Sequence, residues 1–516
     1  MTIEEQIILQ YAIPRTPSNQ EDAPCLHGEE IKRQRQADGS RIDRDRISVP
    51  VNWDQVLELA LFHDVFPSVY RNLEDTGWRE VPEDAVRKFR EKWHEHLARN
   101  LILSHEMDRI LELFARGGVK AIPLKGIFLA RMLYPDTILR SFNDLDIWVR
   151  PSDAKRAGEL LQQIGYELRF GNNGQSYSAE NEYSIPFHRY FPHTRIYVDL
   201  HWSLAKSRDY PAIPEERWWQ QAREGRISGQ GSSTRNFSKQ SPSEQRSSDR
   251  GSSDQMVSDQ DFSGQCPFLL APEDLFIYLT IQIHASAYCY LKHFVDIYQF
   301  LSRWGDQLDC KYIYQTARDI GIVNNLFFVL LTVRNLFDKP IDRPINPSIY
   351  SLTKVPINVS INAPNNALTN ASTNVSNNAS NIRSINTMLD TLLIQLKSNQ
   401  QVKQRTGFLR FYFLRHIFNR QTILSGKYNR DLRQGFCLLL YDRLTQSISS
   451  SLRVLFPSAE GIAARYQLLP YSKKIYLYYC LNPFLIMYWL FRGLVVKSSD
   501  AHGLGILVGP VSSGQR

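Results

Sequence analysis

The sequence predicts an α+β protein in which a small mixed sheet is flanked by mainly helical regions and interrupted by disordered insertions. Four segments, at 119–124, 144–149, 166–170 and 195–202, are short and either apolar throughout or alternating, as strands are. Amphipathic runs of helical period lie between the first two and after the second. The order strand, helix, strand, helix, strand indicates a small α/β domain with a mixed sheet.

Periodicity and composition also define the helical regions and the insertions. Apolar residues recur at three and four positions after Trp53 and again over 84–117. The Ser-rich stretch 226–265 and the Asn-rich stretch 356–386 lack the apolar residues that would offset the entropy cost of ordering. We therefore divide the chain into a disordered N-terminal arm (1–48), a helical N-terminal region (49–117), an α/β core (118–225), a low-complexity insertion (226–265), a helical domain (266–345), an Asn/Ser-rich insertion (346–386), a C-terminal helical region (387–498) and a tail (499–516).

Composition narrows the class of protein. The net charge of +8 and the pI near 9.0 favour contact with phosphates, nucleotides or an anionic surface, without choosing among them. The mean hydropathy of −0.35 argues against a protein with many membrane spans. The six cysteines are scattered and form no CxxC pair, which fits neither a disulfide framework nor a zinc cluster. With an acidic start, MTIEEQIILQ, where a signal peptide is basic, these features predict a cytoplasmic protein.

One apolar run near the carboxyl end is a candidate for a membrane-spanning helix. Residues 475–490 are apolar and aromatic, but Asn482-Pro483 interrupts them. A spanning helix needs about 20 apolar residues, so the run is too short for a clear span. We expect a buried or interfacial helix pair here, and membrane-surface contact through 475–496 stays open beside the cytoplasmic assignment.

The chemistry is predicted from two aspartates in the segment DLDIWV. Asp144 and Asp146 are two residues apart on a predicted strand, so both side chains should leave the same face. Two carboxylates on one face repel each other unless a cation neutralises them. Mg²⁺ suits this arrangement because it takes oxygen ligands and is usually held by one or two carboxylates plus substrate phosphates, and Mn²⁺ is an alternative. Alone, a DxD pattern is short and common, and two solvated strand residues would be the simpler interpretation.

A third carboxylate strengthens the metal interpretation. Asp199 lies in IYVDLHW, another alternating segment. If this strand pairs beside DLDIWV, three carboxylates converge on one sheet face. His201 lies two residues further on the same face, where it could support the site or contact an acceptor, or merely satisfy a hydrogen bond.

The turn before the aspartates offers a phosphate contact. Lys125-Gly126 ends a predicted strand and opens a helix, which brings together backbone N–H groups, a positive helix end and a lysine. An ordinary strand-to-helix turn with an exposed lysine explains the same residues, and on this feature alone it is the better explanation.

These residues together resemble a known family. The run LKGIFLARMLYPDTILRSFNDLDIWVRPSDAKRAGELLQQIGY, followed later by VDLHWSL, is similar to the uncharacterised nucleotidyltransferase family of the DNA polymerase β-like superfamily. The similarity extends over about 50–340 and is most specific over 124–166. It implies that the 118–225 core is a nucleotidyltransferase palm. It also implies Mg²⁺ at Asp144 and Asp146, with Asp199 orienting or deprotonating the acceptor hydroxyl.

The chain departs from the wider superfamily at the phosphate-binding turn. The usual Gly-Ser is replaced by Lys125-Gly126, and no serine follows. Arg140 and Ser141 could supply the triphosphate contacts instead, since an arginine commonly stands before the aspartate pair in this family. A cation on a surface loop explains Arg140 equally well.

The sequence therefore predicts a Mg²⁺-dependent nucleotidyltransferase that moves a nucleoside monophosphate from an NTP such as ATP to an acceptor hydroxyl. The alternative is a non-catalytic nucleotide-binding or protein-interaction module on the same scaffold, because fold and motif do not fix activity. A small molecule or a protein is favoured as acceptor over nucleic acid, since no basic patch with interleaved aromatic residues is apparent.

Overall fold

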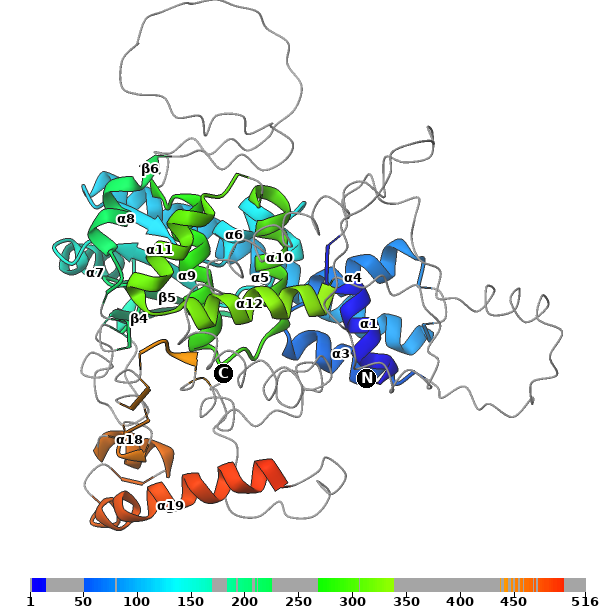
Figure 1. Ribbon diagram of the computed structural model, residues 1–516. Coiled ribbons are helices and arrows are strands. Elements are labelled where there is room, and N and C mark those ends of the chain that lie inside the picture. The colour runs from blue at the N-terminus through cyan, green and yellow to red at the C-terminus, as the bar shows by residue number, and fades with distance from the viewer. Residues whose placement is uncertain are drawn as a thin grey trace, which may run out of the picture. The chain divides into compact units, whose positions relative to one another are not determined.

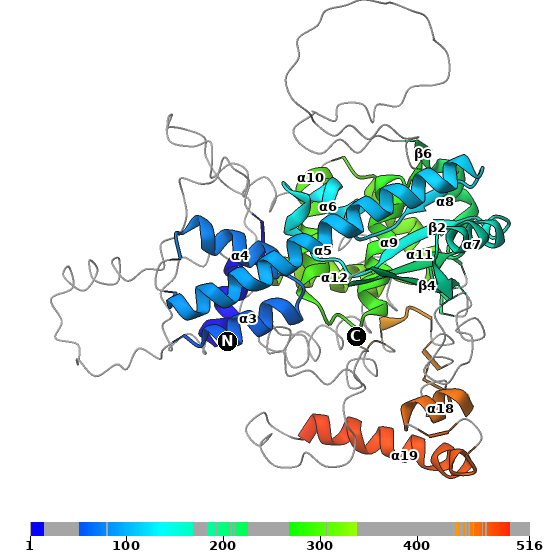
Figure 2. The same cartoon turned by 180° about the vertical axis from the view of Figure 1, so that it is seen from behind.

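A computed structural model describes residues 2–14, 51–78, 81–168, 183–191, 194–206, 209–224 apart from Pro211, 268–337 apart from Asp306, and parts of 437–495. These residues form an α+β protein, as the sequence predicts (Figures 1 and 2). The chain divides into two compact units, and the boundary lies inside one helix, α5 (Glu83–Arg116). One unit contains 92–206 and 214–271, and the other contains 1–91, 207–213 and 272–516.

The first unit is built on a five-stranded mixed sheet in the order β1-β2-β5-β4-β3. Its strands are β1 (Ala121–Pro123), β2 (Leu145–Val149), β3 (Glu167–Leu168), β4 (Ser184–Phe191) and β5 (Thr194–His201). The central pair β2–β5 is parallel, whereas β1 pairs with β2, β4 with β5 and β3 with β4 in antiparallel fashion. A small separate ladder joins β6 (Arg223–Glu224) to β7 (Phe268–Leu269).

Helices cover one face of this sheet. Leu145, Ile147 and Val149 of β2 point into a core together with Val198 and Leu200 of β5. The same core includes side chains of α5, α6 (Ile127–Leu133) and α7 (Ala154–Gln163). Because strand side chains alternate between faces, the intervening residues of β2 and β5 are left on the other face. Part of that face is covered by α8 (Glu215–Gln221), where Trp219 packs on Trp148 with ring centroids 4.7 Å apart.

A buried carboxylate ties α5 to the sheet. Glu106 is 3% exposed and accepts hydrogen bonds from the Tyr166 hydroxyl at 2.9 Å and from Arg109 Nε at 2.8 Å. Arg189 of β4 lies 3.5 Å from the same carboxylate. Burial opposes ionisation of Glu106, but the hydrogen bonds from Arg109 and Tyr166 outweigh it and lower the pKa of this carboxyl.

The second unit is helical in its described parts. Its helices, besides the start of α5, are α1 (Ile3–Tyr11), α3 (Trp53–Phe62), α4 (Phe66–Asp75), α9 (Pro272–Ala285), α10 (Leu291–Trp304), α11 (Cys310–Ile320), α12 (Val323–Phe337), α18 (Ala459–Arg465) and α19 (Lys474–Val495). A buried histidine lies among them: His284 Nε2 donates to the Cys437 carbonyl at 3.0 Å, so Nδ1 accepts from the Tyr210 hydroxyl. Burial lowers the pKa of His284, and both ring nitrogens are satisfied in its neutral form.

The prediction of a disordered arm over 1–48 is wrong at its start. Residues 3–11 form helix α1, which begins with a capping box between Thr2 and Glu5 and buries Ile7, Ile8 and Tyr11. The Asn72 side chain on α4 donates to the carbonyls of Tyr11 and Ile13, which fixes the end of α1. Of the two acidic residues in MTIEEQIILQ, Glu5 therefore caps α1, whereas the Glu4 carboxylate accepts from the backbone N–H of Asn52. Residues 15–48, the insertions 226–265 and 346–386, and the tail 499–516 lie outside the described residues.

One strand of the sheet was not predicted. Strand β4 pairs with β5 over its whole length, from Ser184 opposite His201 to Phe191 opposite Thr194. It contains Pro186, which lacks a backbone N–H and normally argues against an internal strand. The other predicted strands are present: 144–149 corresponds to β2, 195–202 to β5, 119–124 to β1 and 166–170 to β3.

The apolar run near the carboxyl end is a single helix, α19, rather than a pair. Pro483 lies inside it, and the buried Asn482 side chain accepts from Arg465 and the Tyr466 hydroxyl and donates to the Leu455 carbonyl. In the described part of the chain, no helix combines the length and the hydropathy that crossing a membrane requires.

Candidate active site

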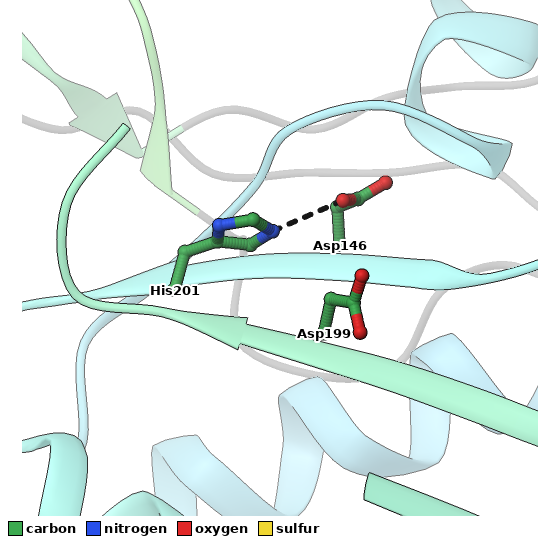
Figure 3. Close-up of side chains that lie close together, drawn as sticks. All are labelled: Asp146, Asp199 and His201. Carbon is green, nitrogen blue, oxygen red and sulfur yellow. Dashed lines mark hydrogen bonds and ion pairs between the residues drawn. The ribbon is translucent and has the colours of Figure 1, made fainter. Parts of the chain in front are cut away.

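Two aspartates face each other across the parallel pair of central strands. Asp146 of β2 is in register with Asp199 of β5, on the face opposite the hydrophobic core (Figure 3). Asp146 is 3% exposed and Asp199 is half-buried. The sequence predicted that these carboxylates would converge if the two strands paired, and the strands are indeed neighbours.

His201 completes a group of three side chains at this point. Its Nε2 atom lies 3.0 Å from Oδ1 of Asp146, and the ring is buried (Figure 3). One donor atom from each of Asp146, Asp199 and His201 can be chosen so that all three lie within 4.8 Å of one another. Two carboxylates and one imidazole at this separation form a donor set that suits a divalent cation.

Lys125 provides the positive charge next to these carboxylates. Its Nζ lies 3.0 Å from Oδ1 of Asp146, the atom that His201 also approaches. Burial alone would raise the pKa of Asp146, but the charge of Lys125 and the hydrogen bond from His201 outweigh burial and hold that pKa well below its usual range. Asp146 is therefore ionised in the folded protein, as a metal ligand must be.

The turn that carries Lys125 is fixed by a glycine and a buried arginine. Gly126 has φ +57°, and a Cβ there would lie 3.3 Å from the Asp144 carbonyl oxygen, so the position favours glycine on both counts. Arg140 is 4% exposed and donates to the Gly126 carbonyl at 3.1 Å, while Asn100 Nδ2 donates to the Arg140 carbonyl. Arg140 thus braces the turn, and the interpretation as a surface cation is wrong.

Ser141 follows Arg140 directly in the chain and lies close to its side chain. Ser141 is half-buried, and its carbonyl oxygen lies 3.5 Å from Arg140 Nη1. Phosphate contacts by Lys125, Gly126, Arg140 and Ser141 stay predictions.

Asp144 does not lie on the strand as expected. Strand β2 begins at Leu145, so Asp144 is in the preceding loop, half-buried, and is not one of the three clustered residues. Arg99 of α5 holds this loop by donating to the Asn143 carbonyl at 3.1 Å and to the Thr194 hydroxyl at 3.1 Å. Burial lowers the pKa of Arg99, and the nearby carboxylate of Asp144 opposes that shift. The role of Asp144 as a ligand stays a prediction.

Sequence reasoning missed Tyr183 at this site. Its ring lies 5.7 Å from the His201 ring, centroid to centroid, and its carbonyl accepts from the backbone N–H groups of Trp202 and Ser203. Burial raises the pKa of Tyr183, and the charges of Lys125, Asp199 and Asp146 act on its hydroxyl. Tyr183 comes just before β4, the strand that was not predicted, so no strand register was available to place it.

One of three comparisons with known proteins finds a match. A family model described as an uncharacterised nucleotidyltransferase matches residues 50–338, more than half of the chain. No curated protein and no solved structure matches the chain.

Proposed function

Because this chain belongs to the uncharacterised nucleotidyltransferase family, we propose that it transfers a nucleoside monophosphate from an NTP to an acceptor hydroxyl. The observation that carries the proposal is the pairing of Asp146 with Asp199 on the face of the central strands opposite the hydrophobic core. Nucleotide transfer in general follows from the family, whereas the residues, the cation and the acceptor named below are our proposal.

The proposed reaction is an in-line displacement at the α-phosphorus. The acceptor oxygen forms a bond to this phosphorus, and the bond to the oxygen bridging to the β-phosphate breaks, so pyrophosphate leaves. One carboxylate oxygen of Asp199, which is half-buried and so within reach of a substrate, takes the hydroxyl proton. Asp146 is buried and ionised, which suits binding of a cation better than proton transfer.

A divalent cation, Mg²⁺ or Mn²⁺, would be held by Asp144, Asp146 and Asp199. When bound, such an ion offsets the negative charge of the triphosphate and of the leaving pyrophosphate. Lys125 lies beside Asp146 and would turn its ammonium group to the phosphates. The buried contacts of Arg140 hold the turn that carries Lys125, so Arg140 contributes to nucleotide binding by fixing this turn.

The acceptor is proposed to be a small molecule or a hydroxyl of a protein. Purified protein would be incubated with each α-labelled NTP and Mg²⁺ or Mn²⁺, and label on the protein or on added small molecules would be followed together with pyrophosphate. Transfer by the wild type and its loss in Asp146→Asn and Asp199→Asn support the proposal. The exposed Glu159→Gln on α7 is the control. Nucleotide binding without transfer would favour the alternative, a binding module on the same scaffold.

We also propose that the protein is cytoplasmic and that residues 475–496 contact a membrane surface. Helix α19 exposes Leu477, Leu481, Phe484 and Tyr488, which follow one another at helical spacing along one side. Lys473 and Lys474 precede this stripe and are exposed. Vesicles containing phosphatidylserine should sediment the wild type but not Leu477→Glu/Phe484→Glu, and equal sedimentation of both would refute the contact.

A further inference from the structure

The burial of His201 is not explained by its hydrogen bonding. Its Nε2 lies 3.0 Å from Asp146, but its Nδ1 is buried and has no hydrogen-bond partner among the described residues. Leaving a buried polar atom unpaired costs about 1–3 kcal/mol. An ion on Nε2 would leave Nδ1 as it is, so what points to a ligand is the position of Nε2, which is buried and turned to the carboxylates of Asp146 and Asp199.

Two of the three donor groups already have the spacing of adjacent ligands on one cation, and the third is close to them. In an octahedral site with metal–ligand distances of about 2.1 Å, adjacent ligands are about 3.0 Å apart and opposite ligands about 4.2 Å apart. His201 Nε2 and Asp146 Oδ1 are 3.0 Å apart, which matches an adjacent pair. The donor atoms of Asp146, Asp199 and His201 all lie within 4.8 Å, so small side-chain rotations would bring the third to a ligand distance.

We propose that His201 is itself a metal ligand, together with Asp146 and Asp199, and that the site therefore prefers Mn²⁺ to Mg²⁺. This inference rests on the proposed function, because it concerns the cation of the same site. With its proton on Nδ1, the neutral imidazole offers the lone pair of Nε2 to the ion. Both ions accept carboxylate oxygen, but Mg²⁺ is the harder ion and keeps oxygen ligands and water, so an imidazole nitrogen in the site weakens Mg²⁺ binding more than binding of the transition-metal ion Mn²⁺.

Sequence spacing and a neighbouring charge support the same assignment. Asp199 and His201 are two residues apart on β5, so the strand itself directs both side chains to the face of Asp146. Lys125 Nζ lies 3.0 Å from the Asp146 oxygen that His201 approaches, so the protein places positive charge at this oxygen. A cation bound here would take over the role that Lys125 has as counter-ion.

The test is Mn²⁺ binding by the full-length protein without nucleotide. Electron spin-echo modulation of bound Mn²⁺ detects a directly coordinated nitrogen, and calorimetric titration gives the Kd for Mn²⁺ and for Mg²⁺. His201→Gln keeps an N–H that can bond Asp146 but removes the imidazole. His188→Gln is the matched control, because His188 of β4 lies on the same sheet face opposite Tyr197 and outside the cluster.

We expect nitrogen modulation in the wild type and in His188→Gln, and none in His201→Gln. The Kd for Mn²⁺ should rise at least about tenfold in His201→Gln, with a smaller change for Mg²⁺. Bound Mn²⁺ without nitrogen modulation in the wild type would overturn the assignment. So would equal Mn²⁺ affinity in the wild type and His201→Gln, or a wild type that binds Mn²⁺ no better than Asp146→Asn.

The result also separates this inference from the proposed function. Nitrogen-coordinated Mn²⁺ in a protein that transfers no nucleotide would leave the metal assignment standing and contradict the catalytic proposal. Nucleotide transfer by a protein whose bound Mn²⁺ shows no nitrogen coordination would support the catalytic proposal and contradict the metal assignment of His201.

Discussion

Asp146 of β2 lies directly opposite Asp199 of β5 in a parallel pair of strands. The backbone register thus brings two carboxylates together on a face that the core does not occupy. Parallel neighbouring strands need a crossover connection, which here runs through α7, β3 and β4. The site is therefore a product of the sheet topology as much as of the local motif.

Lys125→Met should destabilise the protein when no divalent cation is present. Removal of the ammonium group leaves Asp146 with less compensating charge, at a cost of about 1–3 kcal/mol. Added Mn²⁺ should restore part of the lost stability, because a cation can replace the missing charge. Thermal unfolding with and without Mn²⁺ measures this, and the exposed Lys155→Met on α7 is the control. Equal unfolding temperatures of wild type and Lys125→Met in the absence of a divalent cation would contradict the role of Lys125 as counter-ion.

Tyr183 should act by positioning His201. Tyr183→Leu removes the ring that packs on His201, so we expect weaker Mn²⁺ binding, by about tenfold. Tyr183→Phe keeps the ring and should bind Mn²⁺ as the wild type does. Calorimetric titration of both variants distinguishes packing from the hydroxyl. Equal losses in the two variants would assign the effect to the hydroxyl instead.

Glu106→Gln should lower the free energy of unfolding by about 1–3 kcal/mol at neutral pH, because it weakens the contacts that join α5 to the sheet. The folded protein lowers the pKa of Glu106 below its ordinary value of 4.5, so its contribution is fully present above pH 4.5. This contribution disappears as the pH falls through the lowered pKa. Hydrogen exchange in β4 should therefore differ between variant and wild type at pH 7 and converge in acid. The exposed Glu112→Gln on the same helix should match the wild type throughout.

The helical unit should lose stability below pH 6.5 through His284. Burial lowers the pKa of this histidine from 6.5, so the unfolded chain takes up its proton first as the pH falls. Stability is then fully present above pH 6.5 and declines below it, by at most about 1.4 kcal/mol per pH unit for this group. Hydrogen exchange of α9 from pH 7.5 to 5.5 measures the decline, which should be smaller in His284→Gln. An unchanged decline in that variant would assign it to other groups.

Much of the sheet could be predicted because its central strands carry strong local signals. DLDIWV and IYVDLHW alternate clearly, and their apolar residues do lie in the core. The pairing of Asp146 with Asp199 follows once these strands are neighbours. Gly126 was predicted only to open a helix, and its positive φ and close approach to the Asp144 carbonyl are seen in the structure alone.

What could not be predicted depends on contacts between distant segments. Strand β4 was not predicted because it contains Pro186, and without this strand the position of Tyr183 beside His201 could not be predicted either. Arg140 was interpreted either as a phosphate contact or as a loop cation, because its buried partner, the Gly126 carbonyl, lies 14 residues away in sequence. The strand period placed Asp144 on the same face as Asp146, but the strand starts one residue later, where Arg99 holds the loop. The acidic start MTIEEQIILQ was interpreted only as unlike a signal peptide, whereas in the structure Glu5 forms a capping box with Thr2 at the start of α1.

The most direct test of nucleotide transfer is the rate of pyrophosphate release from each NTP by wild type and Asp199→Asn, with Mn²⁺ and candidate acceptors present. Loss of a positioned general base typically costs about 10²–10⁴-fold in rate, and Asn keeps the shape of the side chain. We therefore expect release by the wild type and a loss of this size in Asp199→Asn, with Glu159→Gln unaffected. Pyrophosphate release at the same rate by wild type and Asp199→Asn would contradict the account.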